Sequence, residues 1–370
     1  MFATLAGAYS RKPLPAQPDV LADAERDLAA GRLDEAGLRA MTDGMVREVL
    51  HEMEVVGLGV IGDGGVRTPD RALPWIDGLG GLRPGDPATL PDGETVTRPI
   101  VENGISRPGP VTLRDWQFAA EQSDLIVKQA ILGPYTLAAL AEPDSPGRRR
   151  RLAVAFGEAL NAELHDLDAA GCPLIEIDEP LVMLVGDDPG EWSSVRAAQE
   201  RLTAGFNETD ESHLSLGLWG GDIDRAGYDA LLEVPYKSYL VDVLAGPSAW
   251  RFIAAVPAVR GVIVGAADAG TEQPDETEVL VWAMAWAAAG DRGSARVGCA
   301  PNGSLRTISR HYAHRKCLGL GEAVKIASMG PLQDVARALD EDPIRSKMAE
   351  LRQMAAALHE ADVGLMPMSA

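Results

Sequence analysis

The sequence predicts an α/β protein with the architecture of a (β/α)8 TIM barrel and an N-terminal helical extension. Short apolar segments alternate with helical segments along the whole chain, and about eight of the apolar segments end in Gly, Asp or Pro. A doubly wound sheet is the alternative fold. No GxGxxG pattern follows the first apolar segment, so the dinucleotide-binding form of that alternative has no support. We expect residues 1–370 to form a single domain.

Composition narrows the classes of partner. The 370 residues carry a net charge of −21, which argues against nucleic-acid and anionic-membrane partners because both require a basic surface. The three cysteines are scattered and form no disulfide framework, which predicts a reducing, cytoplasmic location. The N-terminus lacks the pattern of a signal peptide, and the longest apolar stretch, 279–289, is too short to span a bilayer.

The N-terminal part begins with a predicted strand at 2–8 and a helical excursion at 19–57, rich in Ala, Leu, Glu and Arg. A strand at 58–61 leads into a Gly-rich turn that carries Asp63 and Arg67. That turn is either an ordinary loop or the polar rim of a pocket. Residues 71–97 are dense in Gly, Pro and Asp, which predicts a long surface loop.

The rest of the chain continues the alternation of strands and helices. The predicted strands cover 98–105, 126–131, 174–178, 212–219, 236–244, 259–264 and 296–299, and the predicted helices cover 110–123, 148–171, 191–205, 277–289 and 318–329. We expect the strand at 174–178 to be buried and parallel, since it is apolar and bounded by Pro173 and Pro180. It ends in Asp178 and Glu179. Two carboxylates at the C-terminal end of a barrel strand indicate a functional site.

Five stretches, taken in order, resemble the C-terminal catalytic barrel of cobalamin-independent methionine synthase. They are Gly7–Arg11, GLGVIGDGGVR at 57–67, SRPGPVT at 106–112, LGPYT at 132–136 and IDEP at 177–180. The resemblance implies a TIM barrel, related more remotely to uroporphyrinogen decarboxylase. It also implies a tetrahydrofolate or methyltetrahydrofolate carrier and, in the family, a zinc ion that activates homocysteine as a thiolate.

The zinc ligands that the resemblance implies are absent from the matching positions. The family's His-x-Cys pair falls on Gly217 and Trp219, and its Glu falls on Asp242. The last Cys falls on Asn302, unless Cys299 replaces it. Glycine and indole do not bind zinc, and fewer than three ligands remain. His213 is on the same strand as Gly217, but roughly 13 Å further from its end. The sequence therefore predicts no metal site.

Other site residues follow from the resemblance and from their chemistry. Asp178 is expected to anchor the amino group of a substrate or to cap a loop, and clustered acids should have pKa values pushed apart, so that one serves as a general acid. Trp219 either stacks on a flat ligand or plugs the emptied pocket. Our predicted catalytic residues are Asp178, Glu179, Asp242 and Cys299, the last either a nucleophile or an inert buried thiol. Our predicted substrate-binding residues are Asp63, Arg67, Arg107, Trp219, Asp222 and Asn302, the two arginines being either counter-charges or structural partners.

Three functions are consistent with this pattern. The first is a methyltransferase of one-carbon metabolism that moves a methyl group between a folate-type carrier and a small substrate without zinc-thiolate activation. The second is a zinc-free lyase or hydrolase that acts on a small carboxylated molecule by acid–base chemistry. The third is a non-catalytic binding protein. The partner would be a small molecule, and a homodimer is compatible with the sequence.

Overall fold

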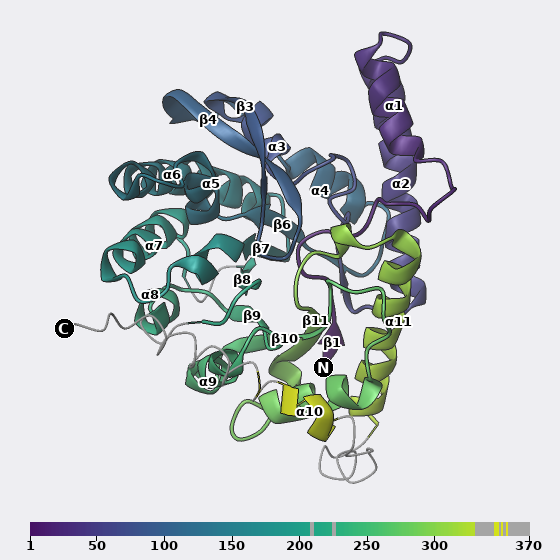
Figure 1. Cartoon of the computed structure of the whole chain (residues 1–370), viewed down its shortest axis with the longest axis vertical. Coiled ribbons are helices and arrows are strands. Elements are labelled where there is room, and N and C mark those ends of the chain that lie inside the picture. The colour runs from purple at the N-terminus through teal and green to yellow at the C-terminus, as the bar shows by residue number, and fades with distance from the viewer. Residues whose placement is uncertain (208–210, 224–226, 330–343, 348, 351–352, 354–370) are drawn as a thin grey trace, which may run out of the picture.

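The computed structural model describes residues 1–207, 211–223, 227–329, 344–347, 349–350 and 353. Its strands form a ring with helices packed outside it (Figure 1), as predicted for a TIM barrel. The ring strands, in chain order, are β1 (Phe2–Ala3), β2 (Val60–Ile61), β5 (Ile126–Val127) with β6 (Gln129–Leu132), β7 (Leu174–Asp178), β8 (His213–Leu218), β9 (Ser238–Asp242), β10 (Gly261–Ala267) and β11 (Val297–Pro301).

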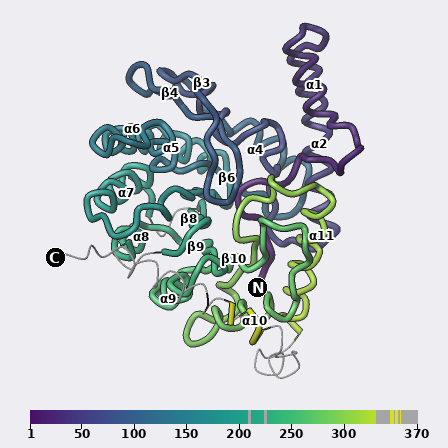
Figure 2. Tube along the Cα trace, viewed as in Figure 1, coloured from purple at the N-terminus to yellow at the C-terminus, as the bar shows by residue number. Residues whose placement is uncertain are grey.

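Hydrogen bonds close the ring. β6 to β11 pair in order and in parallel, and β11 pairs with β1. Beyond β1, the N–H of Gly59 donates to the carbonyl of Ala3 at 3.0 Å. β2 pairs with β5, and Lys128 lies between β5 and β6 in what is one interrupted strand. Counted in this way, the described residues contribute eight parallel strands around the barrel axis. Figure 2 shows the beginning of the chain and its last barrel strand side by side.

Helices cover the outside of the ring and build the predicted N-terminal extension. That extension consists of α1 (Val20–Ala29) and α2 (Glu35–Val55), which project from one side of the barrel (Figure 1). The others are α4 (Leu113–Ala120), α5 (Pro134–Ala141), α6 (Pro146–Ala169), α7 (Pro189–Leu202), α8 (Tyr228–Leu232), α9 (Pro247–Ala255), α10 (Thr277–Ala287) and α11 (Arg310–Ala327). Within the described residues, none of the helices has the length and apolar character needed to cross a bilayer.

The prediction of a long loop at residues 71–97 is wrong, because most of this segment has regular secondary structure. It contains α3 (Leu73–Gly78) and most of an antiparallel hairpin, β3 (Gly80–Thr89) with β4 (Thr95–Ser106). The predicted strand at 98–105 belongs to this hairpin and not to the barrel. A two-stranded ribbon tolerates prolines because both of its strands are edges, so the Pro and Gly content misled the prediction.

Two apolar clusters hold the barrel together. The larger lies between the strands and the surrounding helices. The smaller fills the inside of the ring and consists of Ala6, Trp219, Leu240, Ile263 and Ala300, with Phe2 packed against it. Trp219 is fully buried. The barrel interior is thus closed by one large aromatic ring among small and branched side chains.

Candidate functional site

Asp178 ends β7 at the C-terminal mouth of the barrel and is fully buried. Arg71, which precedes α3, places Nη1 at 2.5 Å from Asp178 Oδ2 and Nε at 3.0 Å from Glu94 Oε2. Burial and the nearby Glu176 raise the pKa of Asp178, and Arg71 opposes that shift. Asp178 Oδ1 and Arg71 Nη2 are buried and have no hydrogen-bond partner among the residues that the structure describes. They offer an acceptor and a donor to a polar ligand.

The tip of the β3–β4 hairpin lies across this mouth. Asp92 Oδ2 accepts hydrogen bonds from Trp219 Nε1 at 3.0 Å and from the Ser304 N–H at 3.2 Å. Glu94 Oε1 lies 3.3 Å from Arg306 Nε, in addition to the contact of Glu94 with Arg71. Burial raises the pKa of Asp92, while Arg71 lowers it. The hairpin therefore brings two acids to the barrel mouth, and sequence reasoning missed both of them, as it missed Arg71.

Asp242 and Asn302 meet at the ends of β9 and β11. Asn302 Nδ2 donates to Asp242 Oδ1 at 3.1 Å, and the N–H of Gly220 donates to Asp242 Oδ2 at 3.2 Å. The N–H groups of Leu244 and Ala245 also donate to Asp242 Oδ1, at 2.9 and 3.1 Å. Burial raises the pKa of Asp242 to about 6 despite these hydrogen bonds. Such a value suits a group that exchanges a proton near neutral pH.

These residues do not fit a zinc ion. Asp242 is already bonded through both carboxylate oxygens, and the Asn302 Oδ1 accepts the N–H of Ala269 at 2.8 Å. The Trp219 ring lies where a side chain at Gly217 would begin. Among the described residues, no group of three or more His, Cys, Asp or Glu side chains is placed to hold a metal. Zinc sites in proteins use three or four such ligands.

Asp63 and Arg67 line a pocket on the β1–β6 side of the mouth, together with Arg71 and Lys128. Asp63 Oδ1 accepts the N–H of Gly65 at 2.8 Å, and burial raises its pKa. Arg67 pairs with Asp43 at 2.5 Å and with Asp115 at 3.5 Å. Both residues are thus at a pocket, and both also hold the surrounding turn in place.

Lys128, which interrupts the third barrel strand, forms a buried ion pair inside the ring. Its Nζ lies 2.8 Å from both carboxylate oxygens of Glu176 and donates to the Leu5 carbonyl at 2.6 Å. Sequence reasoning did not single out either partner. The signal was present, because Glu176 interrupts an apolar strand and Lys128 interrupts another, and a buried charge needs a partner.

Glu179, by contrast, points away from the mouth. Its carboxylate accepts the N–H groups of Tyr135 and Thr136 at 3.0 and 2.7 Å, at the beginning of α5. It also accepts from the Thr136 hydroxyl and from Gln199 Nε2, both at 2.6 Å. Burial raises its pKa to about 7. These contacts make Glu179 a cap of α5 that ties it to α7.

Asp222, Arg107 and Cys299 likewise have structural surroundings. Asp222 accepts the N–H groups of Ser248 and Ala249 at the start of α9. Arg107 pairs with Glu163 and Asp166 of α6, at 2.7 and 2.5 Å. Cys299 is fully buried in the outer cluster, and burial raises the pKa of its thiol to about 12. A thiol in this state is a poor nucleophile.

The sequence pattern described as "Cobalamin-independent synthase, Catalytic domain" matches residues 15–203, about half of the chain. The chain belongs to this family. The matched half of this cobalamin-independent synthase barrel contains Asp178 and Arg71. It ends before Gly217, Trp219, Asp242 and Asn302, the positions that the sequence analysis expects to correspond to the family's metal ligands.

Individual relatives agree with this assignment. The 5-methyltetrahydropteroyltriglutamate–homocysteine methyltransferase of Aeromonas salmonicida is 30% identical over 156 residues, which cover 41% of this chain and 21% of that protein. The methionine synthase of Sulfurisphaera tokodaii is 26% identical over 215 residues, covering 58% of this chain and 61% of that protein. The chain therefore spans only part of the length of these curated relatives.

Solved structures confirm the fold. A B12-independent methionine synthase from Shewanella sp., in complex with selenomethionine, superposes with a TM-score of 0.70 at 19% identity, covering 91% of this chain and 99% of that one. A vitamin-B12-independent methionine synthase from Listeria monocytogenes, itself described as putative, gives a TM-score of 0.66 at 14% identity, covering 88% and 98%. The TIM-barrel architecture predicted from the sequence is confirmed.

Proposed function

We propose that this protein is a methyltransferase of one-carbon metabolism that transfers a methyl group between a folate-type carrier and a small substrate without zinc-thiolate activation. Membership in the cobalamin-independent synthase family supports the reaction class. One observation carries the zinc-free part: the Trp219 ring occupies the side-chain space of Gly217, while Asp242 is bonded through both oxygens. A metal would need the same volume and the same carboxylate.

Asp178 and Arg71 would hold the polar end of the substrate. The free Asp178 Oδ1 would accept a hydrogen bond from an ammonium group, and the free Arg71 Nη2 would donate to a carboxylate. The acceptor atom, a thiol or an amine, would attack the methyl carbon of the carrier, so that a bond to that carbon forms as the carrier's N–C bond breaks. Asp242 would supply the proton that the departing carrier nitrogen takes up, and the proton that the thiol or amine loses would return through solvent to the Asp242 carboxylate.

The test combines metal content with methyl transfer. We expect full-length protein to contain much less than one zinc per chain by plasma mass spectrometry, and to use 5-methyltetrahydrofolate with a panel of thiol and amine acceptors. A chelator should leave the rate unchanged. Asp178→Asn should abolish turnover, whereas the exposed Asp291→Asn should not. One zinc per chain, with activity lost on chelation, would refute zinc-free transfer.

Acid–base chemistry on a small carboxylated molecule is the second candidate, because the pKa of Asp242 is raised to about 6. Turnover of such a molecule in the absence of any folate, lost in Asp242→Asn, would favour a lyase or hydrolase. The homodimer and the cytoplasmic location stay predictions from the sequence, and light scattering of the purified protein tests the first.

A further inference from the structure

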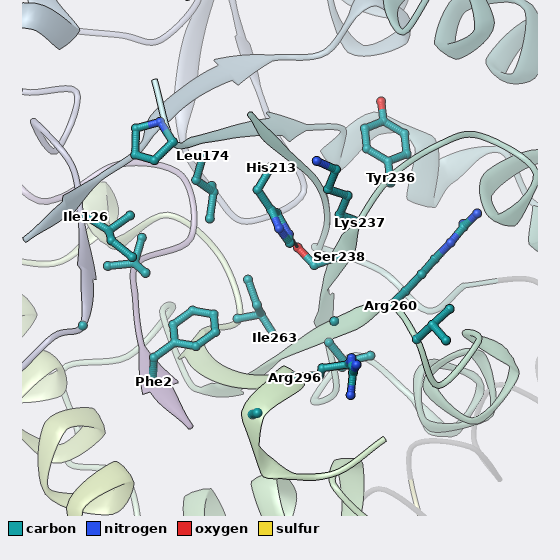
Figure 3. A pocket seen from close by; sticks show the side chains of 17 residues that line it. Phe2, Ile126, Leu174, His213, Tyr236, Lys237, Ser238, Arg260, Ile263 and Arg296 are labelled. Atoms are coloured by element: carbon teal, nitrogen blue, oxygen red, sulfur yellow. Dashed lines mark hydrogen bonds between the residues drawn. The ribbon is translucent and has the colours of Figure 1, made fainter. Parts of the chain in front are cut away.

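A second cavity, of about 600 Å³, lies at the opposite end of the barrel from Asp178 (Figure 3). It is lined by residues at the beginnings of the ring strands, including Phe2 of β1, Leu174 of β7, His213 of β8 and Ser238 of β9. Volumes of roughly 300–1,000 Å³ are typical of sites for small organic molecules. The barrel is therefore open at its N-terminal end, where no part of the candidate site lies.

The length of β7 separates the two sites. Leu174 begins this strand and Asp178 ends it, so the cavity and the barrel mouth are roughly 13 Å apart along the strand. The interior cluster of Trp219, Leu240 and Ile263 fills the space between them. A ligand in the cavity would thus be separated from the Asp178 carboxylate by packed side chains.

The charge of the cavity differs from that of the whole chain. The chain has a net charge of −21, yet the described residues that line this cavity include Lys237, Arg260 and Arg296 and no Asp or Glu. Arg260 Nη1 donates to the Leu232 carbonyl at 2.8 Å and to the Tyr239 hydroxyl at 2.7 Å. The guanidinium charge of Arg260 is therefore held by neutral acceptors. The net negative charge of the chain repels anions, whereas the positive side chains near this cavity attract them.

Arg296 reinforces this charge. Its Nη1 donates to the Arg292 carbonyl at 3.3 Å, and in the part of the chain that the structure describes no carboxylate pairs with Arg296 or with Arg260. Lys237 donates to the Ser212 carbonyl at 3.0 Å. His213 bonds to Ser238 at 2.8 Å, and burial together with Lys237 lowers its pKa to about 4, so the ring is neutral at pH 7. Among the described lining residues, the positive charge comes from Lys237, Arg260 and Arg296.

The rest of the lining is apolar. Figure 3 shows Phe2, Leu174 and Ile263 around the centre of the cavity, while Lys237 and Arg260 lie on one side, with the guanidinium of Arg260 directed away from the centre. Two apolar side chains at this end are exposed to solvent: Val259 is 76% exposed and Ile126 is 49% exposed. An apolar centre with a cationic side matches a ligand that has an apolar body and an anionic group.

We propose that the N-terminal end of the barrel binds a small amphipathic organic anion. Its aromatic or aliphatic body would pack against Phe2, Leu174 and Ile263. Its carboxylate or sulfonate would lie toward the exposed Arg296, with the positive charges of Lys237 and Arg260 further away on the same side. This site is distinct from the mouth that contains Asp178 and does not depend on the function proposed for that mouth.

Binding of 1-anilinonaphthalene-8-sulfonate to the full-length protein tests the proposal. We expect saturable binding at micromolar concentration, followed by fluorescence, that weakens at high salt. Arg296→Glu should weaken it by about fivefold, because it replaces one exposed attraction by a repulsion. The matched control is Arg315→Glu, an exposed arginine of α11 away from the cavity, which should leave the affinity unchanged. N-Phenyl-1-naphthylamine, which has the same rings without the sulfonate, should bind more weakly and ignore Arg296→Glu.

The outcomes separate this site from the others. Affinity unchanged by Asp178→Asn would support a site at the opposite barrel end, and affinity lost in that variant would place the probe at the mouth and overturn the proposal. Equal binding by the two variants at Arg296 and Arg315, or by the charged and neutral probes, would also overturn it. So would a dimer that Arg296→Glu dissociates, because the surface would then belong to a second copy of the chain.

Discussion

The guanidinium of Arg71 meets the carboxylate of Asp178 at 2.5 Å, across a sequence separation of 107 residues. Both side chains are nearly or fully buried, with exposed side-chain fractions of 9% and 0%. The same guanidinium also contacts Glu94, so one arginine joins the hairpin to the central barrel strand. The ion pair therefore connects the hairpin to the barrel. Among the described residues, it also leaves Asp178 Oδ1 and Arg71 Nη2 without a hydrogen-bond partner, so that both can bind a ligand.

A double-mutant cycle on Arg71→Met and Asp178→Asn measures this connection. We expect a coupling of about 2–3 kcal/mol in the free energy of unfolding, because a buried charge is destabilising once its partner is removed. Urea denaturation of the four proteins gives the value. The matched pair is Arg83 with Glu102, each 52% exposed, where the coupling should stay below about 1 kcal/mol. Equal couplings in the two cycles would show that burial does not strengthen the pair.

Gly217→Ala should destabilise the protein by about 1–3 kcal/mol, since its Cβ would collide with the Trp219 ring. Gly44→Ala is the control: Gly44 lies inside α2 with open space at its Cβ position, so alanine should stabilise by up to about 1 kcal/mol. The midpoints of thermal and urea denaturation should fall for Gly217→Ala and rise for Gly44→Ala. An unchanged stability of Gly217→Ala would show that the Trp219 indole moves aside without cost and would contradict this prediction.

Stability should fall as the pH rises from about 4 to about 6. Burial raises the pKa of Asp242 from 3.8 to about 6, so the folded state binds more protons than the unfolded state in this window. The contribution of this one group is about 3 kcal/mol. Asp242→Asn cannot titrate, and its unfolding free energy should lose that part of the slope. An unchanged slope in the variant would assign the proton uptake to other residues.

The three cysteines should be unreactive in the folded protein. Cys172, Cys299 and Cys317 are buried, and burial raises the pKa of each thiol, to about 12 for Cys172 and Cys299. Titration with a thiol-specific chromogenic disulfide at pH 7.5 should detect none of them before denaturation and three after it. Cys299→Ser should retain methyl transfer. Rapid labelling of Cys299, or loss of turnover in that variant, would restore it as a candidate nucleophile.

The barrel could be predicted because its signal is local and repeated. Each ring strand is a short apolar run followed by Gly, Asp or Pro, and the strand from Leu174 to Asp178 carries this pattern clearly. The hairpin at 80–106 was misjudged because its prolines suppress the usual strand pattern, although an isolated two-stranded ribbon tolerates them.

The candidate site was harder to predict because its contacts join distant segments. Asp178 could be found from its strand, but its partner Arg71 lies in a Gly- and Pro-rich stretch without periodicity. Arg107 was predicted to bind substrate because it lies in a motif that resembles the family. In the structure it instead forms ion pairs with Glu163 and Asp166 of α6. No local pattern distinguishes an arginine at a pocket from one that holds two elements together.

The packing of Trp219 over Gly217 also restricts the order in which substitutions could accumulate at these two positions during evolution. A histidine placed first at position 217 would collide with the indole, and a cysteine placed first at position 219 would leave a large void inside the ring. Each single step toward a metal-binding barrel therefore passes through a less stable protein. Trp219 thus forms an evolutionary barrier, because selection for stability opposes each single substitution toward a metal centre at these positions.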